Sequence, residues 1–115
     1  MADALLQEAV LQATDPLNTH GDAPMQRAEQ LLRDGAHAQG CLQAMVELHE
    51  LYFEATDVGS AAYTCALRNA LHLIPMLLHA GDTVTPQMLQ SAKYNCAPLI
   101  TEMLHRVLNG DFDAP

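Results

Sequence analysis

The sequence predicts an all-α protein, and three observations support that class. Aliphatic residues dominate the apolar half of the chain and tryptophan is absent, a composition that suits helix packing better than β-sheet packing. Prolines stand where four stretches of helical apolar periodicity begin, at Pro24, Pro75, Pro86 and Pro98. Glycines follow three such stretches, at Gly35, Gly81 and Gly110, where helices commonly end in a left-handed residue.

These signals place seven helices in one domain of residues 1–110, followed by a frayed tail at 111–115. Thr85 supplies a hydroxyl cap directly before Pro86, and Asp22 and Asn95 lie just upstream of two other prolines. Pro75 is interpreted as a helix start, which would separate His72 from His79. The predicted ranges are 2–13, 24–34, 40–56, 60–71, 74–80, 86–94 and 97–108.

The charge of the chain disfavours one class of function. Fourteen acidic residues stand against five basic ones, and the formal net charge is -9. A protein that neutralises phosphates needs clustered lysine and arginine, so direct nucleic-acid binding is not expected. A basic protein partner fits this charge, and so does the simpler interpretation that acidity keeps a small protein soluble.

No segment predicts a membrane span, a cofactor or a metal site. No apolar run approaches the ~18 residues of a span and the first residues form no secretory signal, so a cytoplasmic protein is expected. Cys41, Cys65 and Cys96 are widely spaced and predict buried free thiols. His49 lies off the helical face of the neighbouring carboxylates, and no nucleotide-binding or nucleophile motif occurs. We therefore expect a protein that is not an enzyme.

Two segments of the chain repeat each other: residues 28–38 align with residues 74–84, and residues 100–110 follow the same apolar pattern. Here the sequence resembles the ankyrin repeat family, whose second helix ends in Leu-Leu-x-x-Gly-Ala and whose first helix starts near Thr-Pro. Residues 31–36 match the first pattern, and residues 77–86 match the junction between two repeats. The resemblance implies stacked helix pairs that recognise proteins, with repeats at 1–39, 58–84 and 85–110.

The sequence also departs from that family. Gly35 and Gly81 lie farther apart than the family period of about 33 residues. The surplus falls in residues 41–57, which we interpret as an inserted or lengthened helix. The Thr-Pro-Leu-His signature is missing, since Ala-Tyr-Thr-Cys occupies its place at residues 62–65. The predicted fold is thus a degenerate ankyrin-like stack of helix pairs, with a plain five- to seven-helix bundle as the alternative.

The candidate binding site lies on this inserted segment. Its glutamates recur at i, i+3 and i+7 and so share one helical face. Two aromatic residues stand beside the acids, and an exposed aromatic ringed by charge makes a good interface anchor. The alternative is that the acids form the solvated outer face of an amphipathic helix. The predicted protein-binding residues are Glu47, Glu50, Tyr52, Phe53, Glu54 and Asp57.

We therefore expect an acidic, non-catalytic protein-binding module whose partner carries a basic surface. In its sharper form the hypothesis is a small inhibitor, or an immunity or anti-defence protein, that masks a basic nucleic-acid-binding surface of its target. A structural homo-oligomeric adaptor is the alternative, and a homodimer stays open. A small metal-dependent enzyme built around His49 is a third hypothesis. The apolar patch of an oligomer would come from Met45, Leu48 and Tyr52 or from Leu99, Met103 and Val107.

Overall fold

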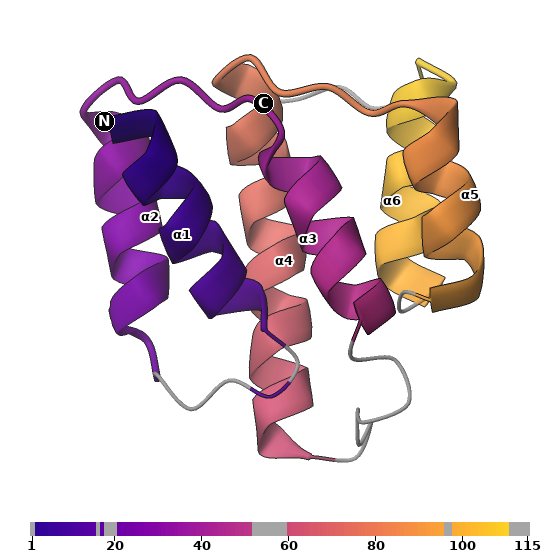
Figure 1. Cartoon of the computed structure of the whole chain (residues 1–115), viewed down its shortest axis with the longest axis horizontal. Coiled ribbons are helices and arrows are strands. Elements are labelled where there is room, and N and C mark those ends of the chain that lie inside the picture. The colour runs from indigo at the N-terminus through magenta and orange to yellow at the C-terminus, as the bar shows by residue number, and fades with distance from the viewer. Residues whose placement is uncertain (1, 16, 18–20, 52–59, 96–97, 111–115) are drawn as a thin grey trace.

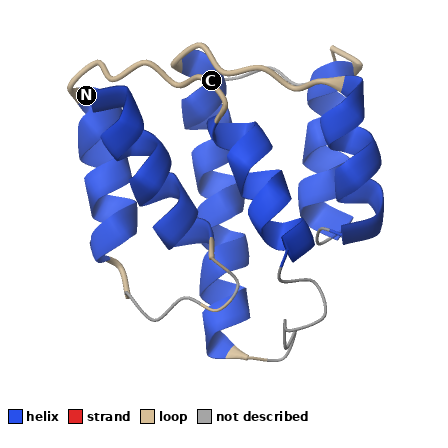
Figure 2. Cartoon of the chain, in the orientation of Figure 1, coloured by secondary structure: helices blue, strands red, loops and turns tan. Residues whose placement is uncertain are grey.

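The computed structural model describes residues 2–15, 17, 21–51, 60–95 and 98–110, and these ranges contain six helices joined by loops, with no strand (Figure 2). The all-α prediction is confirmed. The predicted tail at 111–115 lies outside the described residues. The helices are α1 (Ala2–Thr14), α2 (Ala23–Arg33), α3 (Cys41–Leu51), α4 (Ala61–His79), α5 (Pro86–Asn95) and α6 (Pro98–Leu108).

The helices form two layers of three (Figure 1). The front layer consists of α1, α3 and α5, and α3 packs between the other two. The rear layer consists of α2, α4 and α6, and α4 packs between the other two. Successive helices also pack against each other across the layers, as α1 with α2, α3 with α4 and α5 with α6. The segment that sequence analysis treats as inserted therefore begins with the central helix of the front layer.

The core between the layers is aliphatic. In the central rear helix, Leu73, Ile74 and Leu77 are fully buried, and in the central front helix Leu42 and Met45 are fully buried. No buried side-chain nitrogen or oxygen among the described residues lacks a hydrogen-bond partner. The described core therefore combines apolar packing with complete polar satisfaction, as native interiors do.

The predicted helix-end chemistry is present at several positions. Thr85 Oγ1 accepts a hydrogen bond from Met88 N at 3.2 Å, which confirms the cap of α5. Gly35 and Gly81 adopt positive φ values of 92° and 107° and follow the C-cap residues of α2 and α4, respectively. At both ends a residue after the glycine donates back to the last turn of the helix, from Ala36 N to Leu31 O and from Asp82 N to Leu77 O, each at 3.0 Å. Both helices therefore end in the glycine-containing motif that the sequence predicts.

The predicted helix break at Pro75 is wrong. Helix α4 runs without interruption from Ala61 to His79 and contains Pro75 in its interior. An interior proline lacks the N–H that would bond to the carbonyl of Leu71 and destabilises a helix by about 3 kcal/mol. Burial of Leu73, Ile74 and Leu77 on either side of the proline offsets that amount, because each such side chain contributes about 1.5–3 kcal/mol when buried. The predicted segments 60–71 and 74–80 are therefore one helix.

Two loops meet at the end of the molecule where α2 is followed by α3 and α4 by α5 (Figure 1). Ala38 N donates to Ala80 O at 3.0 Å and so joins the loops through their backbones. The carboxylate of Asp82 is buried between them and accepts from Gly40 N at 3.2 Å and from Leu42 N at 2.9 Å. Asp82, which lies in the loop after α4, thus caps the first turn of α3.

The C-terminal end of α1 is capped by side chains of two other helices. Asn69 on α4 donates its Nδ2 hydrogen to Ala13 O at 2.9 Å, and His49 Nε2 on α3 lies 3.0 Å from Thr14 O. The last carbonyls of a helix have no partner within the helix, so these side chains replace water as donors. A buried polar cluster therefore joins the first helix to both central helices.

Candidate interaction surfaces

The structure describes part of the site that the sequence predicts. Glu47 is exposed on α3, and its Oε1 accepts a hydrogen bond from Gln43 Nε2 at 3.0 Å, one turn earlier. Glu50 belongs to the same helix, but its side chain lies outside the described part of the structure. The remaining four predicted residues lie outside the described residues, namely Tyr52, Phe53, Glu54 and Asp57.

The front layer exposes acidic side chains. Asp3 and Glu8 on α1 are exposed, as is Glu47 on α3. Asp3 also accepts a hydrogen bond from the backbone of His37 at 3.0 Å. Among the described side chains of α1, α3 and α5 there is no lysine or arginine, and His49 is buried. The described charged side chains of this layer are therefore acidic, and Glu47 is the one described on the central helix, while the side chain of Lys93 on α5 lies outside the described part. Arg27 of α2 reaches the same layer, because its Nη1 donates to Gln12 Oε1 at 3.3 Å, and Gln12 Nε2 donates to Glu8 Oε1 at 3.5 Å.

The rear layer carries the arginines. All four arginines of the chain lie in it, and all four are exposed: Arg27, Arg33, Arg68 and Arg106. Two glutamates in the layer pair with arginines one turn later, at 3.8 Å between Glu29 and Arg33 and at 3.4 Å between Glu102 and Arg106. Such exposed i,i+4 pairs stabilise by only about 0.3–0.5 kcal/mol, so the guanidinium groups stay available for other contacts. Within the rear layer, α4 and α6 together therefore carry a net positive charge, whereas the two arginines of α2 stand among the acids Asp22, Glu29 and Asp34.

A stripe along α4 is the feature that sequence reasoning missed. Arg68, His72 and His79 are exposed and stand at i, i+4 and i+11, a spacing that keeps them on one helical face. The sequence interpretation separated the two histidines because it placed a helix break at Pro75. The apolar periodicity of Leu73, Ile74 and Leu77, continuous across the proline, is the signal that could have found the stripe.

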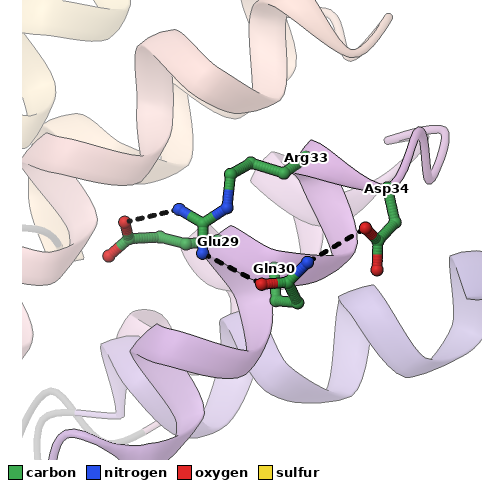
Figure 3. Close-up of polar contacts among 4 residues, drawn as sticks. All are labelled: Glu29, Gln30, Arg33 and Asp34. Atoms are coloured by element: carbon green, nitrogen blue, oxygen red, sulfur yellow. Dashed lines mark hydrogen bonds and ion pairs between the residues drawn. The ribbon is translucent and has the colours of Figure 1, made fainter.

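A groove opens between the C-terminal ends of α2 and α4. It has a volume of about 590 Å³, its apolar walls include Leu32 and Met76, and Arg33 and His79 also line it. Arg33 is held beside the groove by its neighbours on α2: Nη2 donates to Gln30 Oε1 at 3.2 Å, and Nη1 lies 3.8 Å from Glu29 Oε2 (Figure 3).

The polar chain at this groove continues along α2. Gln30 Nε2 donates to Asp34 Oδ1 at 2.9 Å, so an acid stands at each end of the cluster around Arg33 (Figure 3). The two carboxylates balance the guanidinium locally, and this groove is consequently not a concentrated positive site.

A second groove lies between α4 and α6, with a volume of about 210 Å³. Leu71, Leu99 and Met103 supply its apolar lining, and the ion-paired Glu102 and Arg106 supply its polar lining. Leu99 is 54% exposed, which is high for a large apolar side chain in a described helix. The groove thus combines an apolar surface with a guanidinium group.

The residues predicted to form an oligomer patch fall into two groups. On α3, Met45 is fully buried and Leu48 half-buried, while Tyr52 lies outside the described residues. Met45 is therefore part of the core and cannot contribute to a surface patch. On α6, Leu99 is exposed and both Met103 and Val107 are half-buried.

Burial changes the acid–base behaviour of two groups. Desolvation lowers the pKa of His49, although its hydrogen bond to Thr14 O and the charge of Asp15 act in the opposite direction. Desolvation, with the nearby charge of Asp82 as the second cause, raises the pKa of the Cys41 thiol from 9.0 to about 11. Cys41 is buried, as predicted, Cys65 is half-buried, and Cys96 lies outside the described residues.

The described part of the chain contains no group of three or more His, Cys, Asp or Glu residues arranged to hold a metal ion. None of its helices is both long enough and apolar enough to cross a membrane. No protein-family model matches the chain, and neither a curated protein nor a solved structure is detectably similar to it.

Proposed function

We propose that the chain is a non-catalytic protein-binding module that uses its acidic front layer to bind a basic surface of another protein. The observation that carries this proposal is the separation of charge between the layers. The exposed ionisable groups described on the front helices are all acidic, whereas the arginines belong to the rear helices, of which Arg27 reaches α1 through Gln12. Like charges gathered on one face select an oppositely charged partner and accelerate its association.

The architecture supports the same role. Stacked helix pairs bury a shared core and leave broad outer surfaces, and proteins built in this way commonly use such surfaces for recognition. In this chain the front surface is made by α1, α3 and α5, and the molecule measures 35 × 33 × 22 Å. Its broad face is large enough for a standard interface, which buries about 800 Å² per partner.

The partner class follows from the sign of the charge. Basic protein surfaces are typical of nucleic-acid-binding proteins, which need clustered lysine and arginine to neutralise phosphates. Binding to such a surface would mask it, so in its finer form the proposal is an inhibitor, or an immunity or anti-defence protein. Glu8 and Glu47 are the described residues of this site, and the predicted residues Glu50, Tyr52, Phe53, Glu54 and Asp57 would extend it along the chain after Glu47.

Two matched variants test the proposal. The front variant carries Glu8→Gln and Glu47→Gln, and the rear variant carries Arg68→Gln and Arg106→Gln. Each changes two exposed charges, and glutamine matches glutamate in length but is two atoms shorter than arginine. Tagged wild-type protein, front variant and rear variant are used to capture partners from the lysate of the native host at low and high salt.

A protein retained by the wild type and the rear variant, but lost with the front variant and at high salt, is the expected partner. Its purified form should bind nucleic acid, and the wild-type module should displace that nucleic acid in a fluorescence-anisotropy titration, with the front variant at least about tenfold weaker. Equal retention by the front variant would overturn the assignment of the acidic layer. Displacement by neither protein would overturn the masking role.

A further inference from the structure

The outer surfaces of the two layers present different side chains. The front layer presents Glu8 and Glu47, and the rear layer presents Arg68 and Arg106. Apolar features are matched in the same way. Leu5, on α1, is 51% exposed, and the groove between α4 and α6 offers an apolar lining.

We propose that a second copy of the chain docks its front layer on the rear layer of the first. Leu5 would enter the groove between α4 and α6, where Leu71, Leu99 and Met103 would surround it. The residue pattern supports this fit because Leu5 and Glu8 stand at i and i+3 on one helical face. An apolar side chain and a carboxylate one turn apart match a groove that joins an apolar lining to the guanidinium of Arg106, which also pairs with Glu102 at 3.4 Å. The proposal and the protein-binding function would use the same front layer, and they are distinguished because self-association is measured on the purified chain alone.

The size of the two faces is sufficient for such a contact. Both layers lie on the broad faces of the molecule, which measure 35 × 33 Å, whereas a stable interface needs about 800 Å² from each partner. The net charge of -9 opposes association at long range. At 0.1 M salt this repulsion is screened beyond about 10 Å, while charges in contact across an interface are screened much less.

A contact between unlike faces has a distinct structural consequence. Each copy would use its front layer on one neighbour and its rear layer on another, so the interface is heterologous. Such contacts continue into open chains unless the rotation between copies closes a ring. The wild-type protein should therefore associate beyond the dimer as concentration rises.

Sedimentation velocity of the purified full chain at ~10 µM to ~1 mM in 0.1 M salt tests this inference with the front and rear variants defined above. The wild type should associate with increasing concentration, and 1 M salt should weaken that association. The front variant should associate about tenfold more weakly. This result is informative because the variant has a smaller net charge, and association through reduced repulsion alone would become stronger.

Mixing the two variants supplies the second measurement. The front variant keeps an intact rear layer and the rear variant keeps an intact front layer, so an equimolar mixture should form a dimer that grows no further. Leu5→Asn added to the rear variant should abolish this dimer. The inference is overturned if the wild type stays monomeric at ~1 mM, if the front variant associates as strongly as the wild type, or if the mixture stays monomeric while the wild type associates.

Discussion

Asp82 and Leu42 are forty residues apart in the chain, yet Asp82 Oδ2 accepts a hydrogen bond from Leu42 N at 2.9 Å. Through this bond, and a second from Gly40 N to its Oδ1, the loop after α4 supplies the cap of α3. A helix is usually capped by a residue of its own first turn, so here the cap also acts as a tertiary contact between the second helix pair and the loop that follows it.

Asp82→Ala should therefore destabilise the protein by about 2 kcal/mol, because it leaves the N–H of Leu42 buried without an acceptor. Asp82→Asn should have an intermediate effect, since an amide keeps one acceptor oxygen. Asp22→Ala is the matched control, because Asp22 stands at the start of α2 but makes no side-chain cap bond, and only a few tenths of a kcal/mol are expected there. Urea unfolding measures all three changes, and equal losses for Asp82→Ala and Asp22→Ala would contradict the cap.

Gly81→Ala should destabilise the protein more than Gly35→Ala does. Both glycines have positive φ, where an L side chain costs about 1–2 kcal/mol. At Gly81 an added Cβ would also clash with the imidazole of His37, whereas at Gly35 nothing lies within 4 Å of the added atom. Thermal and urea unfolding should place the two variants at least about 1 kcal/mol apart. In a His37→Ala background the difference should shrink, and a difference that stayed unchanged would show that the clash is not its source.

His49 should make the protein less stable in mild acid. Burial lowers the pKa of His49 in the folded protein, so the unfolded chain binds the proton more readily. The free energy of unfolding should then fall as pH decreases below about 6.5, and this contribution should level off below the pKa of the folded state. For one proton the slope cannot exceed about 1.4 kcal/mol per pH unit.

His49→Gln separates this histidine from the other five. Glutamine can still donate to Thr14 O but does not titrate, so the pH dependence of its unfolding free energy should be shallower than that of the wild type between pH 4.5 and 7. Parallel curves for the two proteins would exclude His49 as the source of the acid sensitivity.

Local chemistry in the sequence predicted the helix ends well. Thr85 before a proline and glycines at 35 and 81 carry signals that depend on only a few neighbouring residues, and the structure confirms all three. Asp22 was equally well placed but makes no side-chain cap bond, because its backbone is helical, with φ -91° and ψ -7°, rather than extended. The presence of a capping residue type therefore predicts where a helix ends better than it predicts a side-chain hydrogen bond at that end.

Long-range packing determines two features that the sequence alone did not reveal, the continuity of α4 and the distribution of charge between the layers. Pro75 has the local signature of a helix start, yet burial of Ile74 and Leu77 keeps α4 continuous. That single error hid the common face of Arg68, His72 and His79. The separation of charge between the layers was equally invisible, since it appears only when alternate helices are assigned to alternate layers. The exposure of Glu47 could be predicted because an acid on the outer face of an amphipathic helix needs no tertiary information, and its role in binding stays a prediction.

The helix ends of this protein also set an order in which it can be completed during synthesis. The last carbonyls of α1 receive their donors from His49 and Asn69, and the first amides of α3 receive their acceptor from Asp82. A nascent chain that ends before Asp82 already contains the donors for α1 but can form α3 only with its first amides still hydrated, because burial without a partner costs about 1–3 kcal/mol per group. The first two helix pairs therefore become a finished unit only after the loop that follows them has left the ribosome.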